Sequence, residues 1–163
     1  MTVWVIVADS SPLIGLARIG QLEILHKLAS RVVTPPAVQD EVTLHRREAP
    51  GAAAIRQATW IEVEAPDHLE VEPLAILLDR GEAEAIALAR RLPSATLLLD
   101  DARARRVAER LGLRRIGTVG LLRRAKKAGL IPAIKPHLDA LMANGIYIHR
   151  TLIDAVLKDL GEA

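Results

Sequence analysis

The chain has 163 residues, a formal net charge of +2 and no cysteine, which excludes disulfide bonds, thiolate nucleophiles and zinc–thiolate sites. This length is enough for one domain with its own core, and no segment reaches the roughly 20 apolar residues that span a bilayer. We therefore expect a single cytoplasmic domain over residues 1–163, with no membrane association, in which any metal binds to oxygen or imidazole.

Positive charge is unevenly distributed along the chain. Between Arg103 and Lys127 there are ten Lys or Arg residues and a single acid, Glu109. Such a stretch can face a polyanion such as nucleic acid. It can equally form the solvated faces of two helices, and the sequence of this region leaves both interpretations open.

The first half of the chain alternates short β-branched runs with helical patterns. Residues 3–8 predict a fully buried parallel strand. Pro12 fits the first turn of a following helix, with Ser10 or Ser11 as its cap. Further along we expect a helix over 22–29, a strand over 31–34, a helix that begins at Pro36 and a strand over 60–63.

The second half continues the alternation. The segment LLDRGEAEAIALARRL predicts a helix that starts near Gly81, and TLLLDD predicts a buried strand that ends on acids. After these we expect the helix ARARRVAERLG, the strand LRRIGT, the helix VGLLRRAKKAG and a C-terminal helical extension over about 132–163. This order indicates an α/β fold, a three-layer α/β/α sandwich around a mainly parallel sheet of four to five strands.

Acidic residues follow several of these elements. Ligands bind beyond the carboxyl ends of the strands in such sheets, and the acids expected near that edge are Asp9, Glu41, Glu82, Glu84, Asp100 and Asp101. Carboxylates brought together repel one another unless cations share the site. Hard oxygen ligands favour Mg²⁺ or Mn²⁺, and such ions can promote phosphodiester cleavage.

Each acid also has a purely structural explanation. Asp9 can belong to the cap of the helix that follows it, and one of Asp100 and Asp101 can cap the next helix. Glu41 lies about one turn into its helix, where the helix dipole favours an acid.

Glu82 and Glu84 lie on one predicted helix. Because they are two residues apart, they point about 200° apart around its axis. At most one of them is therefore expected to face the other acids.

At this point the residues match a known family. The ordered words SSPLI directly after Asp9, PPAVQDEV, DRGEAEAIALA, LLLDDARARRVAERLGL and GTVGLLRRAKKAGLI closely resemble those of PIN-domain proteins, specifically the DUF3368 branch. The likeness runs from Val7 to about Leu160 and is most specific from Gly81 to Ile131. It implies an α/β/α domain related to the ribonuclease toxins of toxin–antitoxin pairs, which uses Mg²⁺ or Mn²⁺ to cleave RNA, is often a homodimer and has an antitoxin protein as its partner.

The resemblance also implies roles for particular residues. Asp9 matches the first-strand Asp, Glu41 the second acid, and Glu84 the Asp of a D-A-x-x-A helix start, here E-A-I-A. Asp101, favoured over Asp100, matches the Asp of a T-x-D pattern. The implied catalytic residues are Asp9, Glu41, Glu84 and Asp101; the metal ligands are Asp9, Glu41, Asp100 and Asp101; and Glu82, Ser10 and Thr118 are secondary candidates.

The basic stretch is expected to hold the RNA backbone. The residues assigned to it are Arg103, Arg106, Arg123, Arg124, Lys126 and Lys127. Aromatic residues make up 2% of the chain and Phe is absent, so we expect recognition through shape and backbone rather than base stacking.

Two departures from the family pattern support an alternative function. Glu84 adds a methylene where the family has Asp, and Leu99 replaces the hydroxyl residue of T-x-D. The leading hypothesis is a metal-dependent endoribonuclease that acts on RNA rather than DNA. The alternative is a PIN domain that binds nucleic acid or a protein partner without turnover. A haloacid-dehalogenase-type phosphatase is disfavoured because Ser11 occupies the position of its second Asp.

Overall fold

In residues 3–45 and 47–163, the part of the chain that the computed structural model describes, five parallel strands form one sheet in the order β3-β2-β1-β4-β5. The strands are β1 (Val5–Ala8), β2 (Arg31–Thr34), β3 (Ile61–Val63), β4 (Ala95–Leu98) and β5 (Arg114–Ile116). The chain therefore has the α/β fold with a parallel sheet that the sequence predicts.

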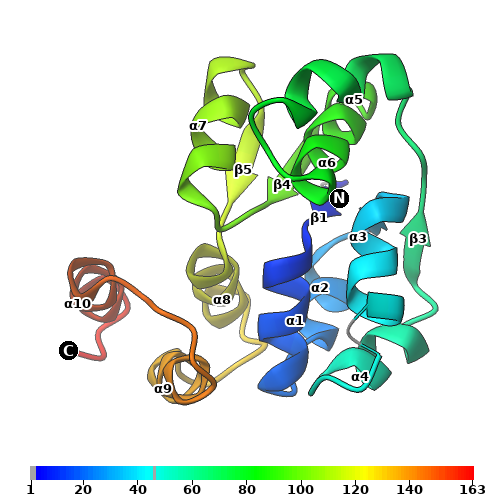
Figure 1. Cartoon of the computed structure of the whole chain (residues 1–163). Coiled ribbons are helices and arrows are strands. Elements are labelled where there is room, and N and C mark those ends of the chain that lie inside the picture. The colour runs from blue at the N-terminus through cyan, green and yellow to red at the C-terminus, as the bar shows by residue number, and fades with distance from the viewer. Residues whose placement is uncertain (1–2, 46) are drawn as a thin grey trace.

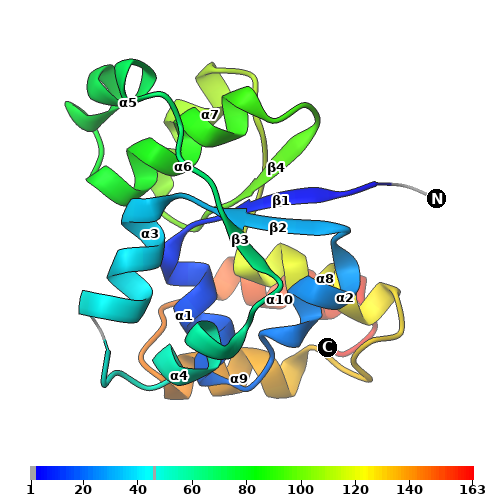
Figure 2. The ribbon, with the colours of Figure 1, turned by 90° about the vertical axis from the view of Figure 1, so that its right-hand side faces the viewer.

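Helices cover both faces of this sheet (Figures 1 and 2). One face carries α1 (Ser10–Arg18), α2 (Glu23–Leu28), α4 (Ala52–Gln57), α8 (Thr118–Lys127), α9 (Lys135–Ala143) and α10 (Arg150–Asp159); the other carries α5 (His68–Ala75), α6 (Arg80–Arg91) and α7 (Ala102–Arg110). Among the described residues, no helix is both long and apolar enough to cross a bilayer.

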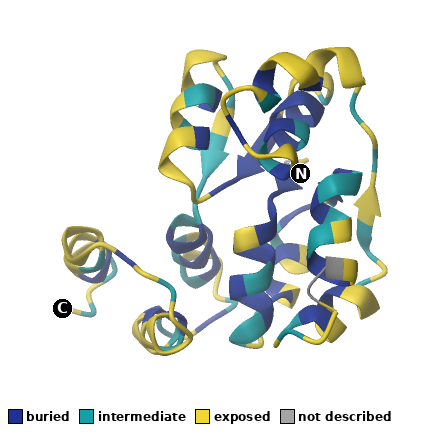
Figure 3. Ribbon diagram, viewed as in Figure 1, coloured by how far each residue is buried: buried dark blue, intermediate teal, exposed yellow. Residues whose placement is uncertain are grey.

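The central strands β1, β2 and β4 are buried along most of their length, as the blue strands of Figure 3 show, whereas the edge strands β3 and β5 are partly exposed. Ile6 and Ala8 contribute to the core under α1 and α8, whereas Val7 between them packs into the core under α6. Successive side chains of a strand point to opposite faces, so both faces of β1 need apolar residues. This explains why β1 is a continuous apolar run rather than an alternating one.

The strand order places the switch point of the sheet between β1 and β4. β2 and β3 lie on one side of β1, and β4 and β5 lie on the other. In open α/β sheets the crevice at the carboxyl ends of two such strands is where ligands bind. Asp9 follows β1 and the pair Asp100–Asp101 follows β4 shortly after its end, so all three lie at this crevice.

The start of α1 differs from the sequence prediction, whereas α6 starts near Gly81 as expected. α1 begins at Ser10 with Asp9 at its N-cap, so the prediction that Ser10 or Ser11 caps it is wrong. α6 begins at Arg80, and its capping residue is Asp79. Both caps therefore place an acid at the carboxyl edge of the sheet.

The irregular stretch between β2 and β3 contains short helices. α3 (Pro36–Asp40) continues directly into a π-helix (Glu41–His45), and α4 follows. In a π-helix the hydrogen bonds run from i to i+5, which rotates Glu41 relative to an ordinary helical position. α3 packs against α6, so Glu41 lies beside the start of α6.

The C-terminal helices are held to the rest of the domain by Glu162. Its carboxylate accepts hydrogen bonds from the backbone N–H groups of Ile134 (2.9 Å) and Lys135 (3.0 Å) and from Lys126 Nζ (2.6 Å). Burial raises the pKa of Glu162, but these three donors outweigh it and lower the pKa to about 2. One side chain thus joins the end of α8, the start of α9 and the segment after α10.

Glu162→Gln is expected to lower the free energy of unfolding at pH 7 by about 1 to 2 kcal/mol, because charge-assisted hydrogen bonds become neutral. The lowered pKa means that the carboxylate stabilises the fold above its ordinary pKa of 4.5, and that this is lost as the pH falls toward 2. Urea unfolding of both proteins from pH 7 to pH 2 should show the difference shrinking, and Glu70→Gln, on the exposed side of α5, should show none.

Candidate functional site

Asp9 is the most buried acid at the carboxyl edge of the sheet. Its backbone N–H donates to Leu98 O at 3.0 Å, which extends the pairing of β1 with β4 by one residue. Its side chain is only 4% exposed, makes no capping hydrogen bond, and leaves Oδ1 buried without a hydrogen-bond partner. A buried carboxylate oxygen without a partner is costly, so capping does not explain this side chain.

Neighbouring carboxylates add to the cost of a charge on Asp9. Burial raises its pKa to about 7; the backbone N–H of Ser10 lowers it, while the charges of Glu82, Asp79 and Glu41 raise it. Three acids from two other parts of the chain therefore act on Asp9, and they define, together with it, the carboxylate cluster.

Asp79 and Glu82 enter the cluster through the start of α6. Asp79 Oδ1 accepts a hydrogen bond from the Glu82 N–H (2.8 Å), and Glu82 Oε1 accepts one from the Asp79 N–H (3.3 Å), which forms a capping box. Burial raises the pKa of Glu82 to about 7, helped by the charges of Asp79, Asp101 and Glu41. The helix start thus holds two acids together in a fixed geometry.

Gly81 separates Glu41 from Asp79. A Cβ atom added at Gly81 would lie 3.6 Å from both Asp79 Oδ1 and Glu41 Oε2. Both oxygens therefore border the space that a side chain at this position would fill, and the glycine keeps that space open.

Asp100 and Asp101 bind to the starts of two different helices. Asp101 Oδ2 accepts from the Ala104 N–H at 2.9 Å and caps α7, while its charge acts on Glu82. Asp100 accepts from the Thr118 N–H at 2.8 Å and from the Thr118 hydroxyl, so it caps α8. The structure joins Asp101 to the carboxylate cluster and commits Asp100 and Thr118 to each other.

Glu84 points away from the carboxylate cluster. Its carboxylate accepts from Arg80 Nε (2.9 Å) and from the Ala37 N–H (3.1 Å), and its side chain is 12% exposed. These bonds join α6 to α3. The angular separation predicted from sequence holds, and Glu82 is the residue that faces the acids.

The predicted RNA-binding residues form two groups, which lie at opposite ends of the strands. Arg103 and Arg106 lie on α7, which starts at the carboxyl edge, and Arg103 Nη1 donates to Leu77 O at 3.4 Å. The other four lie in the last half of α8, a ten-residue helix that is about 15 Å long. The structure therefore places Arg123, Arg124, Lys126 and Lys127 toward the opposite edge.

The side chains as they stand do not form a ready metal-ligand group. Among the side chains that the structure describes, no three of His, Asp or Glu converge closely enough to hold an ion. The donors nevertheless suit a hard cation, because they are carboxylate oxygens, because Asp9 Oδ1 has no other partner, and because a cation removes the repulsion between them.

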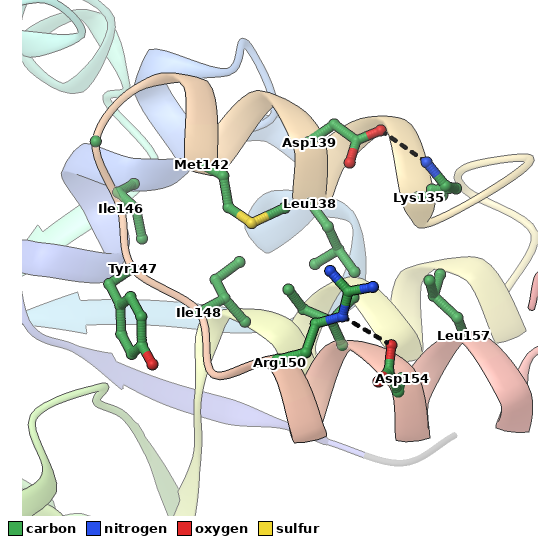
Figure 4. A pocket seen from close by; sticks show the side chains of 12 residues that line it. Lys135, Leu138, Asp139, Met142, Ile146, Tyr147, Ile148, Arg150, Asp154 and Leu157 are labelled. Atoms are coloured by element: carbon green, nitrogen blue, oxygen red, sulfur yellow. Dashed lines mark hydrogen bonds and ion pairs between the residues drawn. The ribbon is translucent and has the colours of Figure 1, made fainter.

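A hollow of about 630 Å³ lies elsewhere, between α9 and α10 (Figure 4). Apolar side chains line it, and the surface pairs Lys135–Asp139 and Arg150–Asp154 lie at its rim. None of the acids of the carboxylate cluster lines this hollow, so it is separate from the candidate site.

Comparison with known families agrees with this fold. The family model for DUF3368, described as a PIN domain, matches residues 5–162. This chain belongs to the DUF3368 family of PIN domains. A search of curated proteins finds no match. Membership confirms the sequence resemblance, indicates a nuclease-like function and nucleic-acid binding, and accords with the divalent metals that PIN domains generally use.

Sequence reasoning missed Asp79 in this PIN domain. The signal was available, because Asp79 followed three residues later by Glu82 has the spacing of a capping box. That spacing places both acids in the first turn of α6, at the edge where Asp9 emerges.

Asp9→Asn is expected to stabilise the metal-free PIN domain at pH 8.5 by about 1 to 3 kcal/mol. A raised pKa means that protonated Asp9 suits the fold and that its contribution is lost as the pH rises through about 7. The gain should therefore shrink as the pH falls below 7 and vanish only below 3.8, the ordinary pKa of Asp. Urea unfolding in EDTA measures it, and Asp154→Asn on α10 is the exposed control; equal stability of wild type and Asp9→Asn at pH 8.5 would contradict the prediction.

Proposed function

We propose that this PIN domain is a metal-dependent endoribonuclease that cleaves RNA phosphodiesters with Mg²⁺ or Mn²⁺. The observation that carries the proposal is Asp9, a buried carboxylate with an unpartnered oxygen among other acids at the switch point of the sheet. Burying such a group lowers stability without serving the fold, which is typical of functional sites.

The proposed ligands for the ions are the acids that act on one another. Asp9 supplies its free Oδ1, Glu41 and Asp79 supply the oxygens beside Gly81, and Glu82 and Asp101 complete the set. We assign Glu82 this role in place of Glu84, because Arg80 and the Ala37 N–H already occupy the Glu84 carboxylate. When bound, the ions activate water and stabilise the leaving oxygen of the phosphodiester.

Arg103 and Arg106 are proposed to hold the RNA backbone beside the carboxylate cluster. Both are exposed on α7, whose first turn carries Asp101 as its cap. Their charges offset the repulsion between the acids and the phosphates, and binding should weaken as salt rises. We also propose that the protein is a cytoplasmic toxin of one domain. It would act as a homodimer, and an antitoxin would control it.

Asp9→Asn is expected to reduce cleavage of a mixed RNA pool in Mn²⁺ by about 100-fold or more, because it removes the central charged oxygen. Asp154→Asn, the same chemical change in an exposed surface pair, should cleave like wild type. Product formation is followed on gels with the three proteins purified side by side. Equal cleavage by Asp9→Asn and wild type would assign the activity to another site or to a contaminant.

Gly81→Ala tests the carboxylate cluster without destabilising α6. The nearest atoms to the added methyl lie at 3.4 to 3.6 Å, which is ordinary contact, so the domain should fold and gain up to about 1 kcal/mol from helix propensity. The methyl fills the space between Asp79 Oδ1 and Glu41 Oε2. Calorimetry should show Mn²⁺ binding weakened about tenfold or more, and unchanged affinity would place the ion elsewhere.

A second candidate function is nucleic-acid binding without turnover. It is favoured because the described side chains do not converge as a metal-ligand group. Titration of wild type with Mg²⁺ and Mn²⁺ distinguishes the two: binding that Asp9→Asn abolishes supports the nuclease, whereas RNA binding with neither metal bound supports the second candidate.

A further inference from the structure

A basic hollow of about 730 Å³ lies at the edge of the sheet opposite the carboxylate cluster. Trp4 precedes β1, Ser94 precedes β4 and Arg114 begins β5, so the hollow is where the strands start. The polar and aromatic residues that line it are Trp4, Ser94, Thr96, Arg114, Arg124 and Lys127, and no Asp or Glu is among the described residues of its lining. Its volume is in the range of small-ligand sites.

Trp4 and Arg124 form a fixed stack in this hollow. Trp4 Nε1 donates to Thr96 Oγ1 at 2.9 Å, which fixes the indole against β4. The guanidinium carbon of Arg124 lies 4.3 Å from the ring centroid, so the cation covers one face of the indole. Arg124 is exposed, and its guanidinium therefore offers a planar, charged surface of its own.

The charges of α8 are not equally available. Arg123 Nε is 2.6 Å from Asp159, and Lys126 Nζ is 2.6 Å from Glu162, so acids near the C-terminus neutralise both. Lys127 Nζ is only within 3.9 Å of Asp159 and its side chain is about half exposed, at 52%.

Arg114 and Arg124 differ from the paired cations of α8, because neither forms an ion pair with any described acid. Three cations with weak or no acidic partners thus meet at one hollow. Uncompensated positive charge around an aromatic group is the arrangement that attracts anions with a planar part.

We propose that this hollow binds a nucleotide unit of single-stranded RNA, with the base on the guanidinium of Arg124 and the phosphate between Arg114 and Lys127. Guanidinium planes stack unpaired bases, and Arg and Lys bind phosphate oxygens. The choice of RNA as the ligand rests on the proposed function, in which RNA is the substrate. The site itself is separate, at the opposite end of the strands from Asp9.

Fluorescence of Trp4 reports directly on this hollow. The chain has two tryptophans, so Trp60→Phe leaves Trp4 as the only one. Titration in EDTA, which prevents metal-dependent cleavage, with a single-stranded RNA 12-mer should quench the emission. Inorganic phosphate should bind about tenfold more weakly or worse because it has no base to stack on Arg124, and adenosine monophosphate should do so because it lacks the neighbouring phosphates that the surrounding positive charge attracts. Equal affinity for the mononucleotide would overturn the assignment to a strand.

Charge variants test the phosphate contacts. Arg114→Ala with Lys127→Ala should weaken binding of the 12-mer about tenfold or more and reduce the slope of log K against log salt by about 0.7, for the one phosphate contact that is lost. The matched control is Arg110→Ala with Lys158→Ala, which removes the same charges at exposed positions outside this hollow. Equal losses in both pairs would overturn the proposal.

Arg124→Lys tests the stacking, because it keeps the charge and removes the planar group. It should abolish most of the quenching and leave the salt slope unchanged; quenching equal to that of the parent protein would overturn the stacked base. Asp9→Asn should bind the 12-mer as wild type does in EDTA. If the wild type quenches with the 12-mer but cleaves no RNA in Mn²⁺, the nuclease alone is contradicted; if it cleaves RNA without quenching, the hollow alone is contradicted.

Discussion

The central position of β1 in a parallel sheet is the constraint on which the candidate site depends. With neighbours on both sides, β1 is paired along both edges and buried on both faces. The hydrogen bond from the Asp9 N–H to Leu98 O carries this order one residue beyond the strand. The backbone of Asp9 is therefore fixed, and its carboxylate lies buried beside the other acids.

Stability and proposed function oppose each other at this point. The apolar strands and helices provide the burial that stabilises the domain, and the same burial raises the pKa of Asp9 and Glu82. The capping box of α6 fixes Asp79 beside Glu82 instead of allowing the two to separate. A fold that served stability alone would place amides or apolar residues at these positions, so the retained repulsion is better explained by a cationic ligand.

The sequence predicts the central strands well because β1, β2 and β4 are short, mostly apolar runs that are largely buried. The strand expected at 31–34 is Arg31–Thr34, and residues 60–63 contain β3. The region before β3 carries no clear period, because a π-helix and short helices occupy it. Which of Glu82 and Glu84 faces the cluster depends on how Ala83 and Ile86 of α6 pack, which no local pattern determines.

The basic residues show what sequence reasoning could still have obtained. A helix that follows a strand returns to the opposite edge of the sheet, so the last turns of α8 lie away from the carboxyl ends. Counting residues along VGLLRRAKKAG would have separated Lys127 from Asp9. The acids Asp159 and Glu162, which neutralise Arg123 and Lys126, could not have been paired from sequence, because packing of the C-terminal helices brings them there.

The hydrogen bonds between Asp100 and the start of α8 limit which residues can stand at position 117. A Cβ atom at Gly117 would lie 2.9 Å from Asp100 Oδ1 and 3.3 Å from Arg105 Nη1, so a larger residue at 117 forces Asp100 out of its position on Thr118. The residue that can stand at position 117 therefore depends on the residue at position 100. Alanine at 117 is therefore expected only where residue 100 is smaller, whereas a smaller residue at 100 is compatible with Gly117.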